Sequence, residues 1–151
     1  MIAEYAGDRA ELLPLFVLAD DSLTEIASYL HAGTVLVADD GDGRTGHAQM
    51  IEIDPETWEL KSLAVEASHR GKGVGRLLVE AGVAHARQHG ARRVVLATGA
   101  ADVGLLRFYQ RLGFRLLRIE RDAFTPAAGY PAELFVDGIR LLDRVWLDRT
   151  W

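Results

Sequence analysis

The sequence predicts an α/β (α+β) fold in which a mixed, mostly antiparallel sheet of six to seven strands is flanked by about four helices. Two observations support this fold class. Residues 34–65 contain three strand-like segments joined by tight turns, which indicates an antiparallel meander. From residue 70 onward, segments with helical spacing alternate with short apolar segments, which is typical of helices that cover both faces of a sheet.

The N-terminal half of the chain predicts one strand, two helices and three further strands. Residues 1–6 form a short strand, and Asp8 caps the next helix, which Pro14 must kink or split. Ser22 and Glu25 have capping-box spacing, so a second helix of about ten residues begins there. The three strands that follow span residues 34–38, 45–53 and 58–65.

The C-terminal half predicts two helices and three strands around a long loop. The first helix starts after residue 73 and ends at Gly90, and the second runs from its cap Asp102 to Gly113. The expected apolar face of the first helix is Val74, Leu77, Leu78, Ala81 and Ala84 or His85. The strands span residues 92–97, 114–121 and 139–148, and residues 122–138 form the loop.

Length and composition indicate a single domain over residues 1–151 in a cytoplasmic protein. The 22 acidic residues outnumber the 17 basic ones, for a net charge of −5, which argues against a nucleic-acid partner. No apolar run is long enough for a membrane helix, and the first residues do not resemble a signal peptide. The chain has no cysteine, which excludes disulfides, thiolate metal sites and a cysteine nucleophile.

Metal binding and serine hydrolysis find no support in the sequence. The five histidines follow no metal-ligand pattern: His85 and His89 stand four apart on a helix, but no third ligand accompanies them. No Gly-x-Ser-x-Gly string occurs. We therefore predict no metal site.

The strongest motif is a glycine loop at residues 70–75, Arg70-Gly71-Lys72-Gly73-Val74-Gly75, between a strand and a helix. Glycines let backbone N–H groups converge on an anion, and the first turn of the helix adds unpaired N–H groups and partial positive charge. The cations of Arg70, Lys72 and Arg76 surround the same point. The motif predicts a phosphate or pyrophosphate site.

The spacing of the glycines excludes the two commonest nucleotide loops. A Walker loop requires Gly-x-x-x-x-Gly-Lys-Ser/Thr, which is absent. A dinucleotide loop requires Gly-x-Gly-x-x-Gly and an acidic residue at the end of the next strand, whereas here the strand ends in Leu96-Ala97.

The loop resembles the Gln/Arg-x-x-Gly-x-Gly/Ala signature of the GNAT (Gcn5-related) N-acetyltransferases. Leu63-Ala64-Val65 precedes it by the usual interval, and Phe108–Phe114 resembles the family's FYxxLGF helix end. The resemblance spans about residues 58–148. The sequence is similar in particular to small bacterial members of the family whose substrate is unknown. It implies a GNAT fold and acetyl-CoA as co-substrate, bound by Leu63, Ala64, Val65, Arg70, Gly71, Lys72, Gly73, Val74, Gly75 and Arg76.

The resemblance also implies a mechanism. Backbone N–H groups near Leu63 and Val65 would hold the acetyl carbonyl, where the two central strands splay apart. Tyr109 matches the tyrosine that protonates the departing thiolate, although its register with apolar helix residues also fits a core position. Glu59 matches the general base of the histone-acetylating members, and Glu52 and water alone are the alternatives.

Alternation along the strand places Glu59, Lys61, Leu63 and Val65 on one face. Glu59 would then stand four residues, or roughly 13 Å, from Leu63, so it would act through water. One departure from the family pattern is the turn at residues 98–102, where Ala100 and Ala101 offer the coenzyme no side-chain hydrogen bond.

These inferences predict an N-acetyltransferase that moves an acetyl group to a primary amine, on a small molecule or peptide, by direct attack in a ternary complex. The loop at residues 124–133 is expected to line the acceptor pocket. A non-catalytic acetyl-CoA sensor and a binder of another phosphate ligand remain alternatives. A homodimer fits the family, and the acceptor itself is not encoded in any motif.

Overall fold

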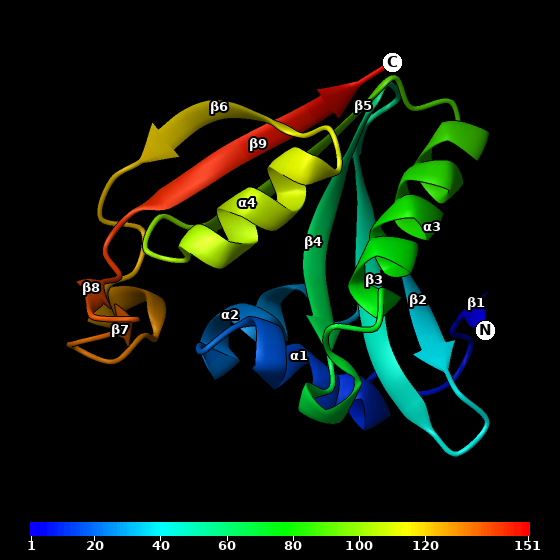
Figure 1. Ribbon diagram of the computed structural model, residues 1–151, viewed down its shortest axis with the longest axis horizontal. Helices are drawn as coiled ribbons and strands as arrows, with labels where there is room; N and C mark the ends of the chain where they lie inside the picture. The colour runs from blue at the N-terminus through cyan, green and yellow to red at the C-terminus, as the bar shows by residue number, and fades with distance from the viewer.

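The sheet holds seven strands in the order β1-β2-β3-β4-β5-β9-β6, and only its central pair, β4 and β5, is parallel (Figure 1). The computed structural model describes residues 1–151. The seven strands are β1 Ile2–Glu4, β2 Thr34–Asp39, β3 Arg44–Asp54, β4 Thr57–Val65, β5 Arg93–Gly99, β6 Arg115–Glu120 and β9 Arg144–Thr150. The predicted mixed, mostly antiparallel sheet is therefore confirmed.

Four α-helices and three short 3-10 turns accompany the sheet, in agreement with the prediction. They are α1 Leu13–Ala19, α2 Leu23–Tyr29, α3 Val74–Gln88 and α4 Val103–Arg111, with η1 Arg9–Leu12, η2 Ala67–His69 and η3 Pro126–Ala128. Pro14 splits the first helix, because it stands in the first turn of α1 directly after η1. The predicted caps hold: Ser22 Oγ accepts from the N–H of Glu25 at 3.1 Å, and Asp102 Oδ1 from that of Leu105 at 3.0 Å. No helix is long and apolar enough to cross a membrane.

Two apolar cores lie on opposite faces of the sheet. The first packs α1 and α2 against the sheet and includes Leu12, Phe16, Ile26, Tyr29, Val35 and Val37. The second packs α3 and α4 and includes Leu60, Leu78, Leu96, Tyr109, Phe114 and Leu147. Because β2 contributes Val35 and Val37 to the first core and Ala38 to the second, its alternation shows that the helices cover both faces.

The central strands part halfway along their length. β4 pairs with β5 only from Thr57–Leu60 to Arg93–Leu96. Beyond these pairs, β5 stays with β9 as far as Gly99, while β4 stays with β3 as far as Val65. The sheet therefore opens at its centre, which Figure 1 shows as the divergence of β4 and β5.

A β-bulge interrupts β4 where the opening begins. Gln49 of β3 stands opposite Ser62, whereas the next residue, Met50, stands opposite Leu60, so Lys61 has no partner in the ladder. An extra residue of this kind re-aims the side chains that follow it.

The bulge makes the predicted alternation along β4 wrong. Lys61 Nζ lies 4.9 Å from the ring centroid of Tyr29, in the α1–α2 core, and Glu59 is paired with Ile51, which packs against that core. Leu63 and Val65 instead pack against the α3–α4 core. Glu59 and Lys61 therefore face α1 and α2, and the two residues after the bulge face α3 and α4.

The C-terminal region differs from the prediction of one strand over residues 139–148. Ile139–Arg140 forms β8, which pairs with β7, Phe135–Val136, in a separate two-stranded ribbon, and β9 begins only at Arg144. The intervening Asp137 and Gly138 both have positive φ, 48° and 80°, which suits a tight hairpin turn. The predicted loop at 122–138 thus contains η3 and β7.

The buried face of α3 is also rotated from its predicted position. Leu78 is fully buried, but Leu77 is 60% exposed. The helix buries Leu78, Val79, Gly82, Val83 and Ala86.

Two adjacent leucines test this packing. Leu78→Ala is expected to lower the free energy of unfolding by about 2–5 kcal/mol, because it leaves a cavity in the α3–α4 core. Leu77→Ala is the matched control and should change it by less than about 0.5 kcal/mol. Urea titration followed by circular dichroism measures both, and equal losses would contradict the assigned face.

Candidate active site

A cleft of about 760 Å³ occupies the opening between β4 and β5. One end, the glycine-loop end, is lined by Arg70, Gly71, Gly73, Gly75, Arg76 and Phe108. The opposite end, the Tyr29 end, is lined by Tyr29, Glu59, Lys61, Tyr130, Arg144 and Trp146. The cleft therefore draws its walls from helices on both faces of the sheet.

The structure brings most of the predicted site residues to this cleft. Leu63, Ala64, Val65, Val74 and Tyr109 line it together with Glu59 and the glycine-loop residues named above. Lys72 is exposed on the glycine loop and is not part of the lining. Glu52 is exposed opposite Trp58 and also lies outside the cleft, so the geometry does not support it as an alternative base.

The glycine loop has the backbone geometry of an anion cradle. Gly71 and Gly73 have φ of +76° and +83°, which disfavour any residue with a side chain, and Gly73 is the N-cap of α3. A Cβ built at either position would meet no atom within 4 Å. The surface above the loop is thus open, and the first turn of the 15-residue α3 presents its N–H groups there.

Arg70 attaches the loop to the end of β4. Its Nε donates to the carbonyl oxygen of Val65 at 3.0 Å. The preceding His69 contacts the Asp40 carboxylate at 2.9 Å and so links the loop to the β2–β3 hairpin. The loop is held on two sides, while the remaining donors of Arg70 stay at the cleft.

The second wall at the glycine-loop end is the start of α4. The backbone N–H of Ala100 donates to the carbonyl of Asp143 at 2.9 Å, so this turn fastens β5 to the segment before β9. Ala100 and Ala101 do not line the cleft, whereas Gly104 and Leu105 do. Thr98, Gly99 and Asp102 of the turn also line the cleft, so polar side chains are present at this wall beside the two alanines.

Tyr109 is buried on the α3–α4 side of the opening. It is 6% exposed and makes edge contacts with Phe108 and Phe114, at centroid distances of 5.1 and 5.9 Å. Burial, and to a lesser degree the charge of Asp102, raises the pKa of Tyr109 above 10. The phenol therefore stays protonated at physiological pH.

Glu59 lies on the other side, at the Tyr29 end. Its side chain is 13% exposed, and Oε2 is 3.9 Å from Lys61 Nζ. Burial raises the pKa of Glu59, while the charges of Lys61 and Arg144 act in the opposite direction. A carboxylate with a raised pKa is a stronger base than an exposed one.

Asp20 joins the segment after β6 to α2. Its carboxylate accepts the hydroxyls of Tyr29 and Tyr130, at 2.8 and 2.9 Å, and the N–H of Ser22 at 3.0 Å. Burial and this carboxylate raise the pKa of both phenols above 10. Ser22 Oγ donates to the carbonyl of Ala128 at 2.7 Å, which adds a second tie.

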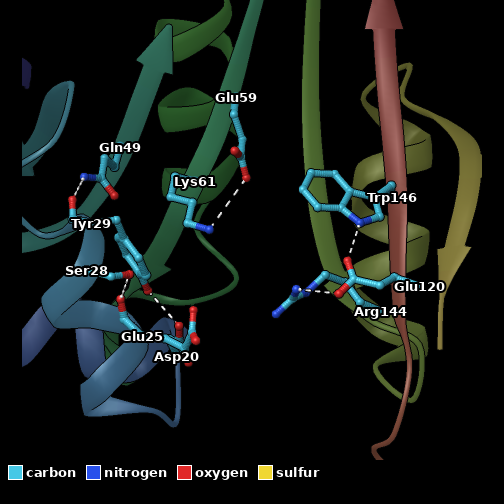
Figure 2. Close-up of polar contacts among 10 residues, drawn as sticks. All are labelled: Asp20, Glu25, Ser28, Tyr29, Gln49, Glu59, Lys61, Glu120, Arg144 and Trp146. Carbon is cyan, nitrogen blue, oxygen red and sulfur yellow. Dashed lines mark hydrogen bonds and ion pairs between the residues drawn. The ribbon is translucent and has the colours of Figure 1, made fainter. Parts of the chain in front are cut away.

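These ties place the loop predicted to line the acceptor pocket against the cleft, where Phe124 and Tyr130 form part of the lining. Figure 2 shows the facing wall, on which Glu120 accepts from Trp146 Nε1 at 3.0 Å and Arg144 Nη1 at 3.3 Å. Sequence reasoning missed Asp20, Lys61 and Arg144, since no local motif links segments so far apart along the chain.

The sheet thus parts beside a glycine loop suited to an anion, with a buried phenol on one face and a carboxylate on the other. The Acetyltransferase (GNAT) family matches residues 6–114, which is more than half of the chain. The chain therefore belongs to the GNAT family and is an acetyltransferase.

Individual relatives agree in sequence and structure. The N-acetyltransferase YvbK of Bacillus subtilis is 34% identical over 140 residues, which cover 91% of this chain and 89% of that protein. A GNAT family acetyltransferase from Elizabethkingia anophelis with acetyl-CoA bound has a TM-score of 0.92 at 27% identity, covering 100% of this chain and 97% of that one. A Bacillus subtilis acetyltransferase in complex with CoA has a TM-score of 0.90 at 31% identity, covering 99% and 97%.

Substituting Asp20 tests the tie at the Tyr29 end. Asp20→Ala should speed backbone hydrogen exchange in residues 122–138 about tenfold or more, because each hydrogen bond to a charged group contributes about 1.5–3 kcal/mol. Exchange is measured by mass spectrometry. Asp21→Ala, in the adjacent exposed residue that also lines the cleft, is the control. Unchanged protection in Asp20→Ala would show that other contacts hold the segment.

Proposed function

We propose that the protein transfers the acetyl group of acetyl-CoA to a primary amine by direct attack in a ternary complex. The observation that carries this proposal is the cleft through the sheet, which presents an anion cradle and a phenol on one face and a carboxylate on the other. Each substrate then has its own approach to the same opening. The amine belongs to a small molecule or a peptide.

In this proposal the glycine-loop end binds the coenzyme. The N–H groups of Gly71, Gly73, Val74 and Gly75 and the cations of Arg70 and Arg76 hold the pyrophosphate. Lys72 contributes charge from outside the cleft. Two relatives, crystallised with acetyl-CoA and CoA, support this assignment.

The backbone of β4 after the bulge holds the reacting end of the coenzyme. Leu63, Ala64 and Val65 line the opening where β5 no longer pairs with β4. An N–H group aimed at the acetyl carbonyl oxygen would stabilise the negative charge that develops there during attack.

The proton transfers then fall to two side chains. Glu59 accepts a proton from the amine through water, since it faces α1 and α2 whereas Leu63 faces α3 and α4. The amine nitrogen forms a bond to the acetyl carbon, the carbon–sulfur bond breaks, and Tyr109 donates its proton to the leaving thiolate. Solvent then takes up the proton held by Glu59 and restores the proton of Tyr109, which returns both groups to their starting states.

A homodimer and a cytoplasmic location are further proposals. Strand β6 is an edge of the sheet and exposes Leu116 and Ile119, at 60% and 67%. An apolar edge strand favours pairing with another chain.

The cradle is tested by Gly73→Ala, with Gly90→Ala at the other end of α3 as the matched control. Both glycines have positive φ and open space around a built Cβ, so each substitution should cost about 1–2 kcal/mol of stability. Only Gly73→Ala should also weaken acetyl-CoA binding in calorimetry, by about tenfold or more, because its methyl group would meet the pyrophosphate. Equal affinities in the two variants would place the coenzyme elsewhere.

Tyr109→Phe separates an enzyme from a non-catalytic sensor. With an amine that wild type acetylates in a CoA-release screen, the substitution should lower kcat about 10²–10⁴-fold and leave coenzyme affinity within about twofold. Tyr5→Phe, outside the cleft, is the control. Wild-type protein that binds acetyl-CoA but acetylates no amine in the panel would favour the sensor. Thermal stabilisation of the protein by ATP or NAD, but not by acetyl-CoA, would contradict both the enzyme and the sensor.

The role of Glu59 is tested by the dependence of kcat/KM on pH. Since the base must be ionised and its pKa is raised, activity should fall as the pH drops through a value above 4.5, the ordinary one. Glu59→Gln should lower kcat/KM about 10²–10⁴-fold and remove this limb. Glu52→Gln should keep the fall of kcat/KM at acidic pH. If this fall also survives in Glu59→Gln, another group accepts the proton of the amine.

A further inference from the structure

Two cationic side chains lie at the Tyr29 end of the cleft, on opposite walls (Figure 2). Lys61 comes from the bulge of β4, and Arg144 from the start of β9. Lys61 Nζ is 3.9 Å from Glu59 Oε2, and Arg144 stands on the facing wall of the same cleft. The proposed base and both cations therefore line one end of the cleft.

The ammonium group of Lys61 is weakly engaged by the protein. Its nearest carboxylate oxygen, Glu59 Oε2, is 3.9 Å away, which is beyond hydrogen-bond distance. Its other contact is the face of the Tyr29 ring, at 4.9 Å from the centroid. The side chain is nevertheless only 32% exposed, so three N–H donors stand in a partly dehydrated cleft.

Arg144 is positioned by its surroundings but keeps most of its donors free. Nη1 donates to Glu120 at 3.3 Å, and the guanidinium lies 5.1 Å from the ring centroid of Phe124. The same Glu120 carboxylate accepts from Trp146 at 3.0 Å. Glu120 is not part of the cleft lining, so it holds Arg144 and Trp146 from behind.

The neighbouring acids satisfy these cations only in part, because Glu120 pairs with one nitrogen of Arg144 and Glu59 Oε2 stays 3.9 Å from Lys61 Nζ. Asp20 already accepts three hydrogen bonds, from Tyr29, Tyr130 and Ser22. Asp21 is exposed and forms no ion pair, and Glu59 becomes neutral when it takes up a proton. The remaining donors of Lys61 and Arg144 face the cleft and are available to a ligand that supplies acceptors.

We propose that the acceptor carries a carboxylate beside its amine, as an amino acid does, and that Lys61 and Arg144 bind this carboxylate. The planar guanidinium suits a carboxylate, and the flexible ammonium can approach from the opposite wall. The amine then faces Glu59, and Trp146 and Phe124 offer aromatic surface to an apolar side chain. This inference rests on the proposed acetyl transfer and specifies its substrate class.

Matched acceptors test the inference without changing the protein. L-Phenylalanine is compared with L-phenylalaninamide and 2-phenylethylamine, and L-tryptophan with L-tryptophanamide and tryptamine, by CoA release at saturating acetyl-CoA. Wild type should show a kcat/KM about tenfold or more higher for the carboxylates. Equal or better rates with the amides or amines would overturn the proposal.

Variants then show which groups make the distinction. Lys61→Met and Arg144→Gln should each lower the ratio of kcat/KM for the carboxylates to kcat/KM for the amides about 10- to 100-fold, whatever common change follows from the altered pKa of Glu59. Lys61→Arg should restore part of the preference. Arg140→Gln, an exposed arginine outside the cleft, is the control. Equal losses for carboxylates and amides would assign Lys61 and Arg144 a structural role and contradict the inference.

Failure of the proposed function can be distinguished from failure of this inference. If no compound is acetylated, calorimetry with CoA-saturated protein compares binding of the amino acids with that of their amides. Tighter binding of the carboxylates, lost in Arg144→Gln, supports the site even though catalysis is not observed. Equal binding of both sets of compounds would contradict it.

Discussion

The parting of β4 and β5 after Leu60 and Leu96 is the constraint on which the rest of the structure depends. Up to these residues the two strands satisfy each other's backbone groups in a parallel ladder. Beyond these residues, β4 pairs only with β3 and β5 only with β9. The edges of β4 and β5 that face each other therefore line a cleft. Backbone polar groups in such a place favour a polar ligand.

The bulge at Lys61 turns this opening into a site with two distinct sides. Without the extra residue, Glu59 and Leu63 would face the same helices. With it, the glycine loop and Tyr109 gather on the face of α3 and α4, and Glu59 and Lys61 on the face of α1 and α2. The opening therefore presents different chemical groups on the two faces of one sheet.

Local patterns predicted most of the fold and the glycine-loop end. The helix caps at Ser22 and Asp102 and the turn at Pro14 depend on neighbouring residues, so sequence spacing is sufficient to find them. The glycine loop at residues 70–75 could be found in the same way, because its residues are adjacent in the sequence. The Asp137–Gly138 turn carries a comparable local signal, an Asp-Gly dipeptide with positive φ at both residues, inside the segment 122–138 predicted as loop.

The Tyr29 end could not be predicted in this way. Asp20, Lys61, Tyr130 and Arg144 come from four distant segments, and only tertiary packing brings them together. The bulge at Lys61 could not be predicted from the sequence of β4 either, because buried and less buried residues still alternate through it. What sequence spacing missed is therefore the Tyr29 end, where we propose that the acceptor binds.

In the proposed mechanism, both substrates bind in this opening before any bond is broken. Initial rates measured while the concentrations of acetyl-CoA and the best amine are both varied test it most directly. Direct attack in a ternary complex predicts double-reciprocal lines that intersect. Parallel lines would contradict the account, since they would show that the acetyl group is first transferred to the protein.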